Sequence, residues 1–233
     1  MPVTDNGPPA AGLWIFGYGS LMWRPDFPFV ERVRATIAGY HRAFCIASTF
    51  HRGSMDRPGL VLGLDRGGAC EGIAYRIATA DAPAVLAYLR ARELIYGVYR
   101  ETSVPAHFAP GASVEAAHVL AYTVERCHPA YTGRLPLAVQ AAIIKGAQGR
   151  SGADLDYLIN TVRHLKDLGI RERHIERLLG LAAGYTANDL NDVMARPSVR
   201  GMRATWSRRP TKLPRLPLGD QRRFGHRIAT TRA

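Results

Sequence analysis

The chain has little of what would place it in a membrane, a secretory compartment or a metal site. Its 233 residues contain three cysteines, Cys45, Cys70 and Cys127, without CxxC spacing, and eight histidines that are scattered singly. An odd, unpatterned set of cysteines favours reduced thiols over disulfides, and no metal site is predicted. No stretch approaches the roughly 20 apolar residues of a membrane helix. Residues 1–12 lack the basic and apolar pattern of a signal peptide, so we expect a cytoplasmic protein.

Acidic residues are also scarce, and the imbalance is local. The chain has 31 Lys and Arg against 19 Asp and Glu, a net charge of +12, and residues 200–233 hold ten of the basic residues against Asp220 alone. This tail therefore carries +9 and the remainder about +3. From residue 197 it alternates proline, arginine and small residues without apolar periodicity, which predicts an extended or disordered segment. Weak contact with polyanions is expected of it, without base stacking, because Trp206 and Phe224 are its only aromatic residues.

Composition otherwise indicates one folded domain. A hydrophobic fraction of 47% and a charged fraction of 21% fit a globular protein of this length. We expect a flexible N-terminus at residues 1–12, with Pro2, Pro8 and Pro9, a catalytic domain at 13–196 and the basic tail at 197–233.

Short strands come first and helices later, which predicts the α+β class. The apolar pattern predicts strands at 13–16, 34–40, 43–48, 60–64, 72–77, 102–108 and 114–124. A turn at Asp65-Arg66-Gly67-Gly68 would join the fourth and fifth of these. Helices are predicted from a cap at Asp81 to a stop at Gly97, and at 137–147, 154–168, 171–181 and 187–195. Six or seven strands before a block of helices favour a partly closed sheet or a small mixed β-barrel with surrounding helices.

A short glycine turn, Phe16-Gly17-Tyr18-Gly19-Ser20-Leu21, follows the first strand. Glycine permits unusual backbone conformations and close approach of a ligand, and successive N–H groups in such a turn can bind a carboxylate or an oxyanion. At Gly19 we expect a positive φ or a close approach that a β-branched residue such as valine would block. The alternative is a tight turn that serves geometry alone. Ser20 lacks the GxSxG elbow of a nucleophile, and the glycine pair lacks the third glycine of a dinucleotide site.

Glu93 is a carboxylate on an apolar helix face. It follows Val85 and Leu89 at steps of four, so the three side chains share one side of the helix. Burial there would raise its pKa and let it exchange protons near neutral pH. The alternatives are a salt bridge to Arg90, Arg92 or Arg100, or a helix edge from which the side chain reaches solvent.

Four further residues are candidates with ordinary alternatives. Tyr99 follows the Glu93 helix and Tyr131 lies in Pro129-Ala130-Tyr131-Thr132-Gly133, but a buried tyrosine usually packs its ring and makes one hydrogen bond. Arg52, on a polar loop after His51, could grip a substrate carboxylate or lie in solvent. Cys45, within a predicted strand, fits a small core residue.

Several segments together resemble one known family. The similarity spans roughly residues 14–179 in the right order, with segments FGYGSLMWRP at 16–25, TFHRGS at 49–54, GIAYRI at 72–77, RELIYGVY at 92–99, PAYTG at 129–133 and DYL at 156–158. This set resembles the ChaC-like family of glutathione-specific γ-glutamylcyclotransferases. Two features depart from the family pattern: His128-Pro129 stands where Asn-Pro is common with Thr132 in place of an aliphatic residue, and the basic tail has no counterpart.

The resemblance implies a fold, a reaction and site residues. The fold is a small closed mixed sheet with helices around it. The family's Tyr-Gly-Ser-Leu loop, which binds the γ-glutamyl group through backbone N–H groups, falls on Tyr18, Gly19, Ser20 and Leu21, and its catalytic glutamate falls on Glu93. The implied reaction converts glutathione to 5-oxoproline and Cys-Gly without a cofactor or metal.

Three other functions remain open at this level. The substrate could be another γ-glutamyl peptide or amine. The protein could be a non-catalytic regulator, an idea linked to cation transport in this family. The tail could make polyanion binding the main function. The sequence leaves the oligomeric state open.

Overall fold

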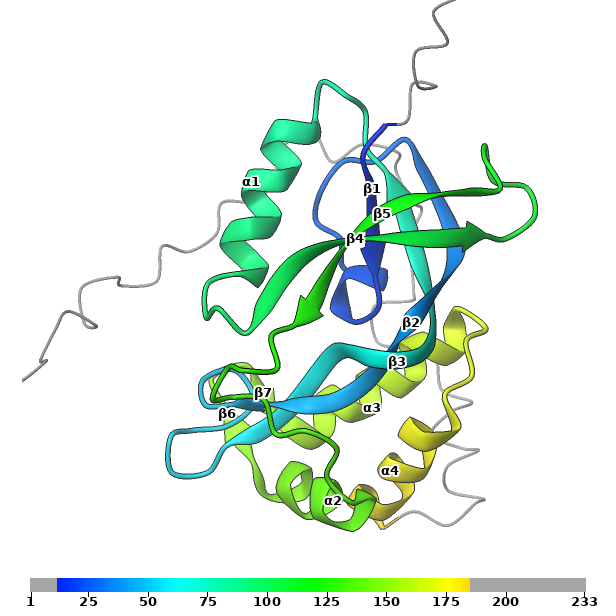
Figure 1. Ribbon diagram of the computed structural model, residues 1–233. Coiled ribbons are helices and arrows are strands. Elements are labelled where there is room, and N and C mark those ends of the chain that lie inside the picture. The colour runs from blue at the N-terminus through cyan, green and yellow to red at the C-terminus, as the bar shows by residue number, and fades with distance from the viewer. Residues whose placement is uncertain (1–11, 185–233) are drawn as a thin grey trace, which may run out of the picture.

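A closed barrel forms the centre of the molecule in the computed structural model, which describes residues 12–184 (Figure 1). Its strands follow the order β1-β3-β2-β4-β5. They are β1 (Trp14–Gly17), β2 (Glu31–Ser48), β3 (Gly59–Arg76), β4 (Tyr99–Phe108) and β5 (Ala116–Val124). Neighbours are antiparallel except β1 and β5, which pair in parallel through Ile15 and Leu120. The sheet is therefore mixed and closed, and the expected fold class is confirmed.

Two strands are much longer than the sequence pattern predicted. The predicted strands at 34–40 and 43–48 are one 18-residue strand, β2, and those at 60–64 and 72–77 are likewise one strand, β3. The predicted turn at Asp65-Arg66-Gly67-Gly68 was wrong. Gly67 and Gly68 have φ of 104° and 72°. Opposite them, β2 has a register shift between Ala38 and Tyr40, and this irregularity accommodates the two glycines, so that the pairing of β2 and β3 continues on both sides. The hairpin loop lies at 49–58 instead.

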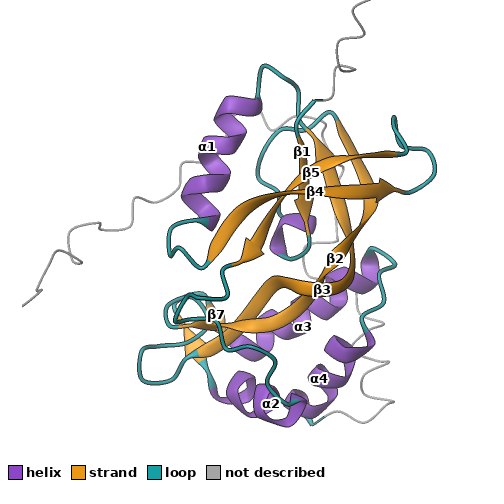
Figure 2. Cartoon of the chain, in the orientation of Figure 1, coloured by secondary structure: helices purple, strands orange, loops and turns teal. Residues whose placement is uncertain are grey.

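Helices cover two sides of this barrel, as Figure 2 shows by colour. Helix α1 (Ala82–Glu93) lies along one side, while α2 (Leu137–Gly146), α3 (Asp154–Asp167) and α4 (Arg173–Ala183) lie below the extended arm of β2 and β3. A two-stranded hairpin of β6 (Gln148–Gly149) and β7 (Gly152–Ala153) separates α2 from α3. The helix predicted at 187–195 and the tail at 197–233 lie outside the described residues. None of the helices within 12–184 has the length and apolarity to span a membrane.

Helix α1 carries Glu93 at its C-terminal end. Val85, Tyr88 and Leu89 bury the face that packs on the barrel. The helix ends at Glu93 rather than at Gly97, and Asp81 occupies the N-cap position without a side-chain hydrogen bond. Gly97 has a φ of 67° in the turn that leads into β4. This early end leaves Glu93 facing the barrel from the last helical turn.

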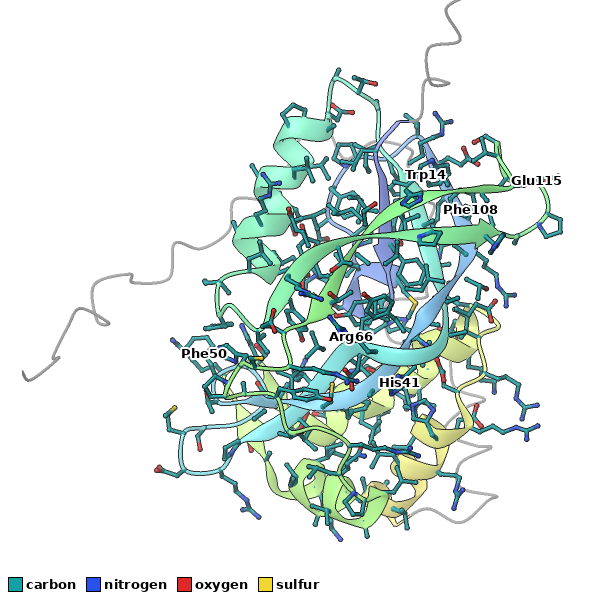
Figure 3. The ribbon with its side chains drawn as sticks, viewed as in Figure 1. Trp14, His41, Phe50, Arg66, Phe108 and Glu115 are labelled. Carbon is teal, nitrogen blue, oxygen red and sulfur yellow. The ribbon has the colours of Figure 1, made fainter. Side chains whose placement is uncertain are left out.

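The apolar core is continuous from the barrel to the helices. Ile15, Phe16 and Tyr75 of the barrel strands are fully buried in it, and Leu158 and Ile175 bring α3 and α4 into the same cluster. Near one end of the barrel, Trp14 and Phe108 pack with ring centroids 4.5 Å apart (Figure 3). Each such buried side chain contributes on the order of 1.5–3 kcal/mol, so these contacts hold the site's supporting elements rigidly.

One edge of β3 lies open to side chains, and the site is built on it. Strand β2 pairs with β3 along its whole length, but β1 pairs only with its last residues, Ile73 to Arg76. Within the described residues, the other edge of β3 from 59 to 72 has no strand partner. Backbone groups on such an edge need other hydrogen-bond partners.

Candidate active site

The turn after β1 is tightly packed at Gly17. Residues 20–22 form a short 3₁₀ helix, η1 (Ser20–Met22). A Cβ at Gly17 would lie 3.1 Å from Leu21 Cβ and 3.2 Å from Met22 N, so this position needs glycine for close approach. Gly19 differs from expectation: its φ is −127°, outside the left-handed region, and an added Cβ would meet only Leu62 Cδ1 at 3.6 Å. The constraint on side-chain size therefore lies at Gly17.

Two buried side chains hold the carbonyl groups of this turn. Arg42 Nε donates to the Tyr18 carbonyl, and the Tyr75 hydroxyl lies 3.0 Å from the Leu21 carbonyl and 2.8 Å from that of Met22. Arg42 and Tyr75 are both almost completely buried. The turn therefore rests on the core through its oxygen atoms.

The remaining carbonyls are used within the turn. Met22 N–H donates to Gly19 O at 2.9 Å and Arg24 N–H to Ser20 O at 2.8 Å. Across residues 12–184 no hydrogen bond is recorded from the N–H groups of Gly19, Ser20 or Leu21, which precede the first donor of η1. Residues 18–21, hereafter the donor loop, thus direct acceptors inward and keep consecutive donors available, the arrangement that suits an anion.

Glu93 is the last residue of α1 and lies on the helix face that carries the buried Val85 and Leu89. Its side chain is 18% exposed, and Arg92 Nε lies 3.2 Å from its Oε1. Burial raises the pKa of Glu93 above its usual range, while the charge and hydrogen bond of Arg92 oppose that rise. The predicted desolvation and the alternative salt bridge are therefore both present. A carboxylate in this state can accept and return a proton.

Arg92 connects Glu93 to the donor loop. Its Nη2 donates to Ser20 Oγ at 3.0 Å, and its Nη1 lies 3.2 Å from the Tyr88 hydroxyl and 3.0 Å from the Arg24 carbonyl. The Ser20 hydroxyl thus accepts from a cation. Such a contact holds the hydroxyl in place and supplies no base that would make it a nucleophile.

The charge of the Glu93 carboxylate raises the pKa values of three tyrosines, Tyr18, Tyr99 and Tyr157, and also that of Tyr122. Burial raises the pKa of Tyr18 and Tyr99 well above the ordinary value, and the negative charge of Glu93 adds to the rise in both. Tyr157 of α3 also feels Glu93, and burial raises its pKa to about 12. All three therefore remain protonated donors at neutral pH.

The open edge of β3 fixes two of these rings. The Tyr99 hydroxyl donates to the Leu62 carbonyl at 2.7 Å, and the Leu62 N–H donates to the Tyr157 hydroxyl oxygen. Two residues earlier on the same edge, the Leu60 N–H donates to Asp154 Oδ2 at 2.6 Å. The edge that lacks a strand is satisfied by side chains, and this brings α3 and β4 to one site.

Arg52 lies beside this group but is engaged by backbone. Its Nη1 donates to the Ser151 carbonyl at 2.6 Å and to that of Ala153 at 3.2 Å, and its guanidinium lies 5.2 Å from the centre of the Tyr157 ring. It therefore ties the β6–β7 hairpin to the 49–58 loop. Among residues 12–184 its side-chain hydrogen bonds all come from Nη1, so Nη2 and Nε are the atoms that a substrate carboxylate would contact.

Tyr131 makes the single hydrogen bond of the ordinary alternative. Its hydroxyl donates to Asp65 Oδ2 at 2.8 Å, and Asp65 also pairs with Arg126 at 2.7 Å. Burial and the Asp65 carboxylate raise its pKa, and Cys45, fully buried as expected, is a further neighbour. Glu93 is not among the groups that act on it, so a substrate role for Tyr131 stays a prediction.

Sequence reasoning missed four supporting residues: Arg42, Tyr75, Arg92 in its link to Ser20, and Tyr157. Tyr157 stood in the DYL segment of the resemblance without an assigned role. Arg42 could have been found from strand alternation, because it shares a face with Phe44 in β2. Nothing in the sequence indicated which backbone group its guanidinium would meet.

Asp154 is a second buried carboxylate that the sequence did not single out. It is completely buried, and its Oδ1 has no hydrogen-bond partner among the described residues. Burial raises its pKa to about 7, against the lowering effects of the Leu60 N–H and the Arg52 charge. It stabilises the β3 edge rather than facing the donor loop.

Comparison with known proteins gives consistent relatives. The family described as "ChaC-like protein" matches residues 13–183. A glutathione-specific γ-glutamylcyclotransferase of Escherichia coli is 35% identical over 83% of this chain and 80% of its own. Glutathione-specific γ-glutamylcyclotransferase 1 of Homo sapiens is 38% identical over 68% of this chain and 71% of its own. A crystal structure of the glutathione-specific γ-glutamyl cyclotransferase from yeast superposes with a TM-score of 0.67 at 22% identity, over 76% of this chain and 98% of that one.

Proposed function

This chain belongs to the ChaC-like family, and from that membership and its site we propose that it is an enzyme, a γ-glutamylcyclotransferase that converts glutathione to 5-oxoproline and Cys-Gly. The observation that carries the proposal is Glu93: a carboxylate with a raised pKa, linked through Arg92 to a loop with available backbone donors.

The reaction is an intramolecular acyl transfer. The α-amino nitrogen of the γ-glutamyl group attacks the γ-amide carbonyl carbon, a five-membered ring closes, and the bond to the cysteinyl nitrogen breaks. At neutral pH the attacking amine is an ammonium ion, so a base must first remove a proton. Glu93 takes this proton and passes it to the leaving nitrogen as the C–N bond breaks. The ring nitrogen, which attack leaves with one proton too many, gives up that second proton, and the released Cys-Gly amine takes up a proton to become an ammonium ion. Two protons thus move from the attacking to the leaving nitrogen, and the step balances without a redox or metal centre.

Burial makes Glu93 suited to both halves of that transfer. A carboxyl with an ordinary pKa would hold the proton too weakly to return it, whereas the raised pKa of Glu93 brings donor and acceptor strengths closer. The charge and hydrogen bond of Arg92 oppose that rise and favour the carboxylate form. The site thus balances a burial effect against one cation.

The donor loop binds the γ-glutamyl end of the substrate. The N–H groups of Gly19, Ser20 and Leu21 supply consecutive donors for its α-carboxylate, with the acceptors of the loop already engaged on the other side. Holding the chain folded brings amine and carbonyl within reach, and such orientation lowers the barrier to ring closure.

Tyrosines and an arginine complete the proposed substrate contacts. Tyr18 and Tyr99 line the carboxylate of Glu93, and both are protonated donors with rings that exclude water. Arg52 and Tyr131 are proposed to contact the distal part of glutathione, Arg52 through its charge. A wider preference for other γ-glutamyl peptides or amines is the second candidate, since the donor loop contacts only the γ-glutamyl end.

Turnover of glutathione tests the proposal. Purified protein incubated with glutathione should release 5-oxoproline and Cys-Gly in equal amounts, as measured by chromatography with mass detection. A parallel panel of γ-glutamyl dipeptides and γ-glutamyl amines measures specificity through kcat/KM. A folded protein that forms neither product from any member of the panel would contradict the enzyme and favour a regulatory role.

We propose a cytoplasmic location and only an accessory role for the tail. Cys45 and Cys70 are buried free thiols and Cys127 is an exposed one, which suits a reducing compartment. Truncation after Ala195 should keep kcat/KM within a few-fold of the full chain and weaken retention on a polyanion column. A truncated protein that is folded but inactive would show that residues beyond 195 belong to the catalytic domain.

A further inference from the structure

We propose that Arg42 is a positioning residue for this site: its guanidinium holds the Tyr18 carbonyl and thereby orients and polarises the peptide whose N–H, that of Gly19, binds the α-carboxylate of the γ-glutamyl group. The inference rests on the proposed function. It assigns work to a buried cation that the proton transfer itself does not use.

The Arg42 side chain contacts the donor loop, η1, β3 and the N-cap residue of α4. It extends from β2, is 1% exposed, and donates through Nε to the Tyr18 carbonyl. Its Nη2 donates to the Glu71 carbonyl at 2.6 Å and lies 3.6 Å from Met22 Sδ. Its Nη1 pairs with Glu172 Oε1. A fork with these fixed partners has one orientation, so the Tyr18 carbonyl is held in one direction.

The Tyr18 carbonyl and the Gly19 N–H belong to the same peptide unit. In a trans peptide the two groups point in opposite directions, and the described residues contain no cis peptide bond. Fixing the carbonyl toward Arg42 therefore fixes the N–H away from it. A cation on the carbonyl oxygen also draws electron density from the amide, which makes the N–H a stronger donor.

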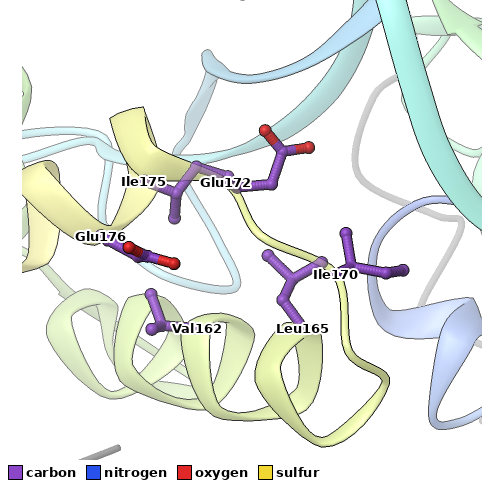
Figure 4. A pocket seen from close by; sticks show the side chains of 6 residues that line it. All are labelled: Val162, Leu165, Ile170, Glu172, Ile175 and Glu176. Atoms are coloured by element: carbon purple, nitrogen blue, oxygen red, sulfur yellow. The ribbon is translucent and has the colours of Figure 1, made fainter. Parts of the chain in front are cut away.

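Glu172 makes the buried charge tolerable. Residue 172 is the N-cap of α4, and its side chain is 18% exposed where that of Arg42 is fully buried. Figure 4 shows its carboxylate turned away from the apolar side chains of Val162 and Leu165. His174 reinforces the contact, because its Nε2 lies 3.0 Å from the Arg42 carbonyl. An unpaired guanidinium at this depth would be strongly destabilising.

A purely structural ion pair is the competing explanation. Such a pair would affect unfolding alone, because its removal would leave the loop donors where they are. The positioning role predicts a change in ligand affinity and in the electronic state of one amide, both measured on folded protein.

The test combines Arg42→Met with Glu172→Gln, so that no buried carboxylate is left unpaired. In a Glu93→Gln background, which binds without turnover, isothermal titration calorimetry should show Kd for glutathione rising about tenfold, the effect of weakening one charge-assisted hydrogen bond. Arg42→Lys, which keeps a donor but loses the fork, should fall between the parent and the double variant. With Glu93 present, KM should rise by a similar factor while kcat stays within about threefold, since ground state and transition state lose the same contact.

The matched control is Arg34→Met with Glu71→Gln, an ion pair between side chains of β2 and β3 that does not reach the loop and whose replacement keeps the Glu71 carbonyl that Arg42 contacts. It should leave Kd unchanged. Without any substrate, the Gly19 amide proton should move upfield in the Arg42 variant and stay in place in the control. The inference would be overturned if the wild type is active while the folded Arg42 variant keeps a Kd within twofold of its parent and an unmoved Gly19 resonance. An inactive wild type would instead contradict the proposed function.

Discussion

Two carboxylates act on the same tyrosine, Tyr157, from different regions of the molecule: Glu93 at the end of α1 and Asp154 at the start of α3. Burial raises the pKa of each, that of Asp154 to about 7. Asp154 is fully enclosed and accepts the Leu60 N–H, whereas Glu93 keeps 18% of its side chain exposed and pairs with Arg92 beside the donor loop.

The difference separates the proposed catalytic carboxylate from a structural one. Desolvation alone shifts both pKa values upward, so a perturbed pKa does not by itself identify the base. Proton exchange also needs access and a bound reactant, which the donor loop supplies next to Glu93. The region around Asp154 instead closes an open strand edge.

The largest expected effect tests the catalytic side of this comparison. Glu93→Gln keeps the shape of the side chain but cannot accept a proton, so kcat for glutathione should fall by on the order of 10²–10⁴ while the thermal midpoint hardly moves. Glu101→Gln is the control, because Glu101 lies in β4 and pairs with Arg90 on the outer face of α1. More than about a tenth of wild-type kcat in Glu93→Gln would refute its role as the base.

Asp154→Asn tests the structural side through stability. Because the folded-state pKa of Asp154 is raised, its contribution to the free energy of unfolding is fully present below about pH 4, where the carboxyl is protonated in both states. That contribution is lost as pH rises through about 7, where the buried carboxyl ionises. The shift from 3.8 to about 7 sets an upper bound of roughly 4 kcal/mol. Asparagine keeps an oxygen for the Leu60 N–H but carries no charge.

Denaturant unfolding at several pH values should therefore show the free energy of unfolding of the variant rising relative to that of the wild type between about pH 4 and 7. Above about pH 7 the difference should be constant. Its kcat should stay within a few-fold of wild type. A stability difference that does not vary with pH, or a loss of turnover like that of Glu93→Gln, would erase the distinction between the two carboxylates.

Arg92→Met sharpens the comparison by removing the cation that only Glu93 has. Arg92 lowers the pKa of Glu93, so its loss should raise that pKa and move the acid limb of the kcat/KM profile to higher pH. Arg90→Met, which loses only the pair with Glu101, should leave the limb in place. An acid limb that stays in place or moves to lower pH in Arg92→Met would show that Arg92 does not lower the pKa of Glu93.

The smallest effect is expected for Ser20→Ala. The donor loop acts through its backbone, and the Ser20 hydroxyl only accepts from Arg92. Turnover should remain within about threefold of wild type, in line with the loss of a single hydrogen bond between side chains. Intact-mass analysis during turnover should find no adduct, and an acyl group on Ser20 would replace the proton-transfer mechanism with a covalent one.

The sequence alone determined the class of fold and the family, and it predicted the two central parts of the proposed site. Periodicity gave Glu93 its buried face, and the glycine turn and resemblance gave the donor loop, because both signals lie within a few neighbouring residues. It misjudged Gly19, where the structure assigns the close approach to Gly17, and it divided β3 at Gly67, since local turn chemistry cannot register the partner strand that holds such a glycine in a ladder.

Only the tertiary structure decided what holds these parts in place. Arg42 meets the Tyr18 carbonyl 24 positions away and Glu172 130 positions away, and Tyr99 and Tyr157 contact the carbonyl and the N–H of Leu62 on one strand edge. These pairings depend on which strand edge remains open and on where α3 and α4 pack against it. Such long-range contacts form because buried polar groups must find partners, and the choice of partner is set by the fold rather than by neighbouring residues.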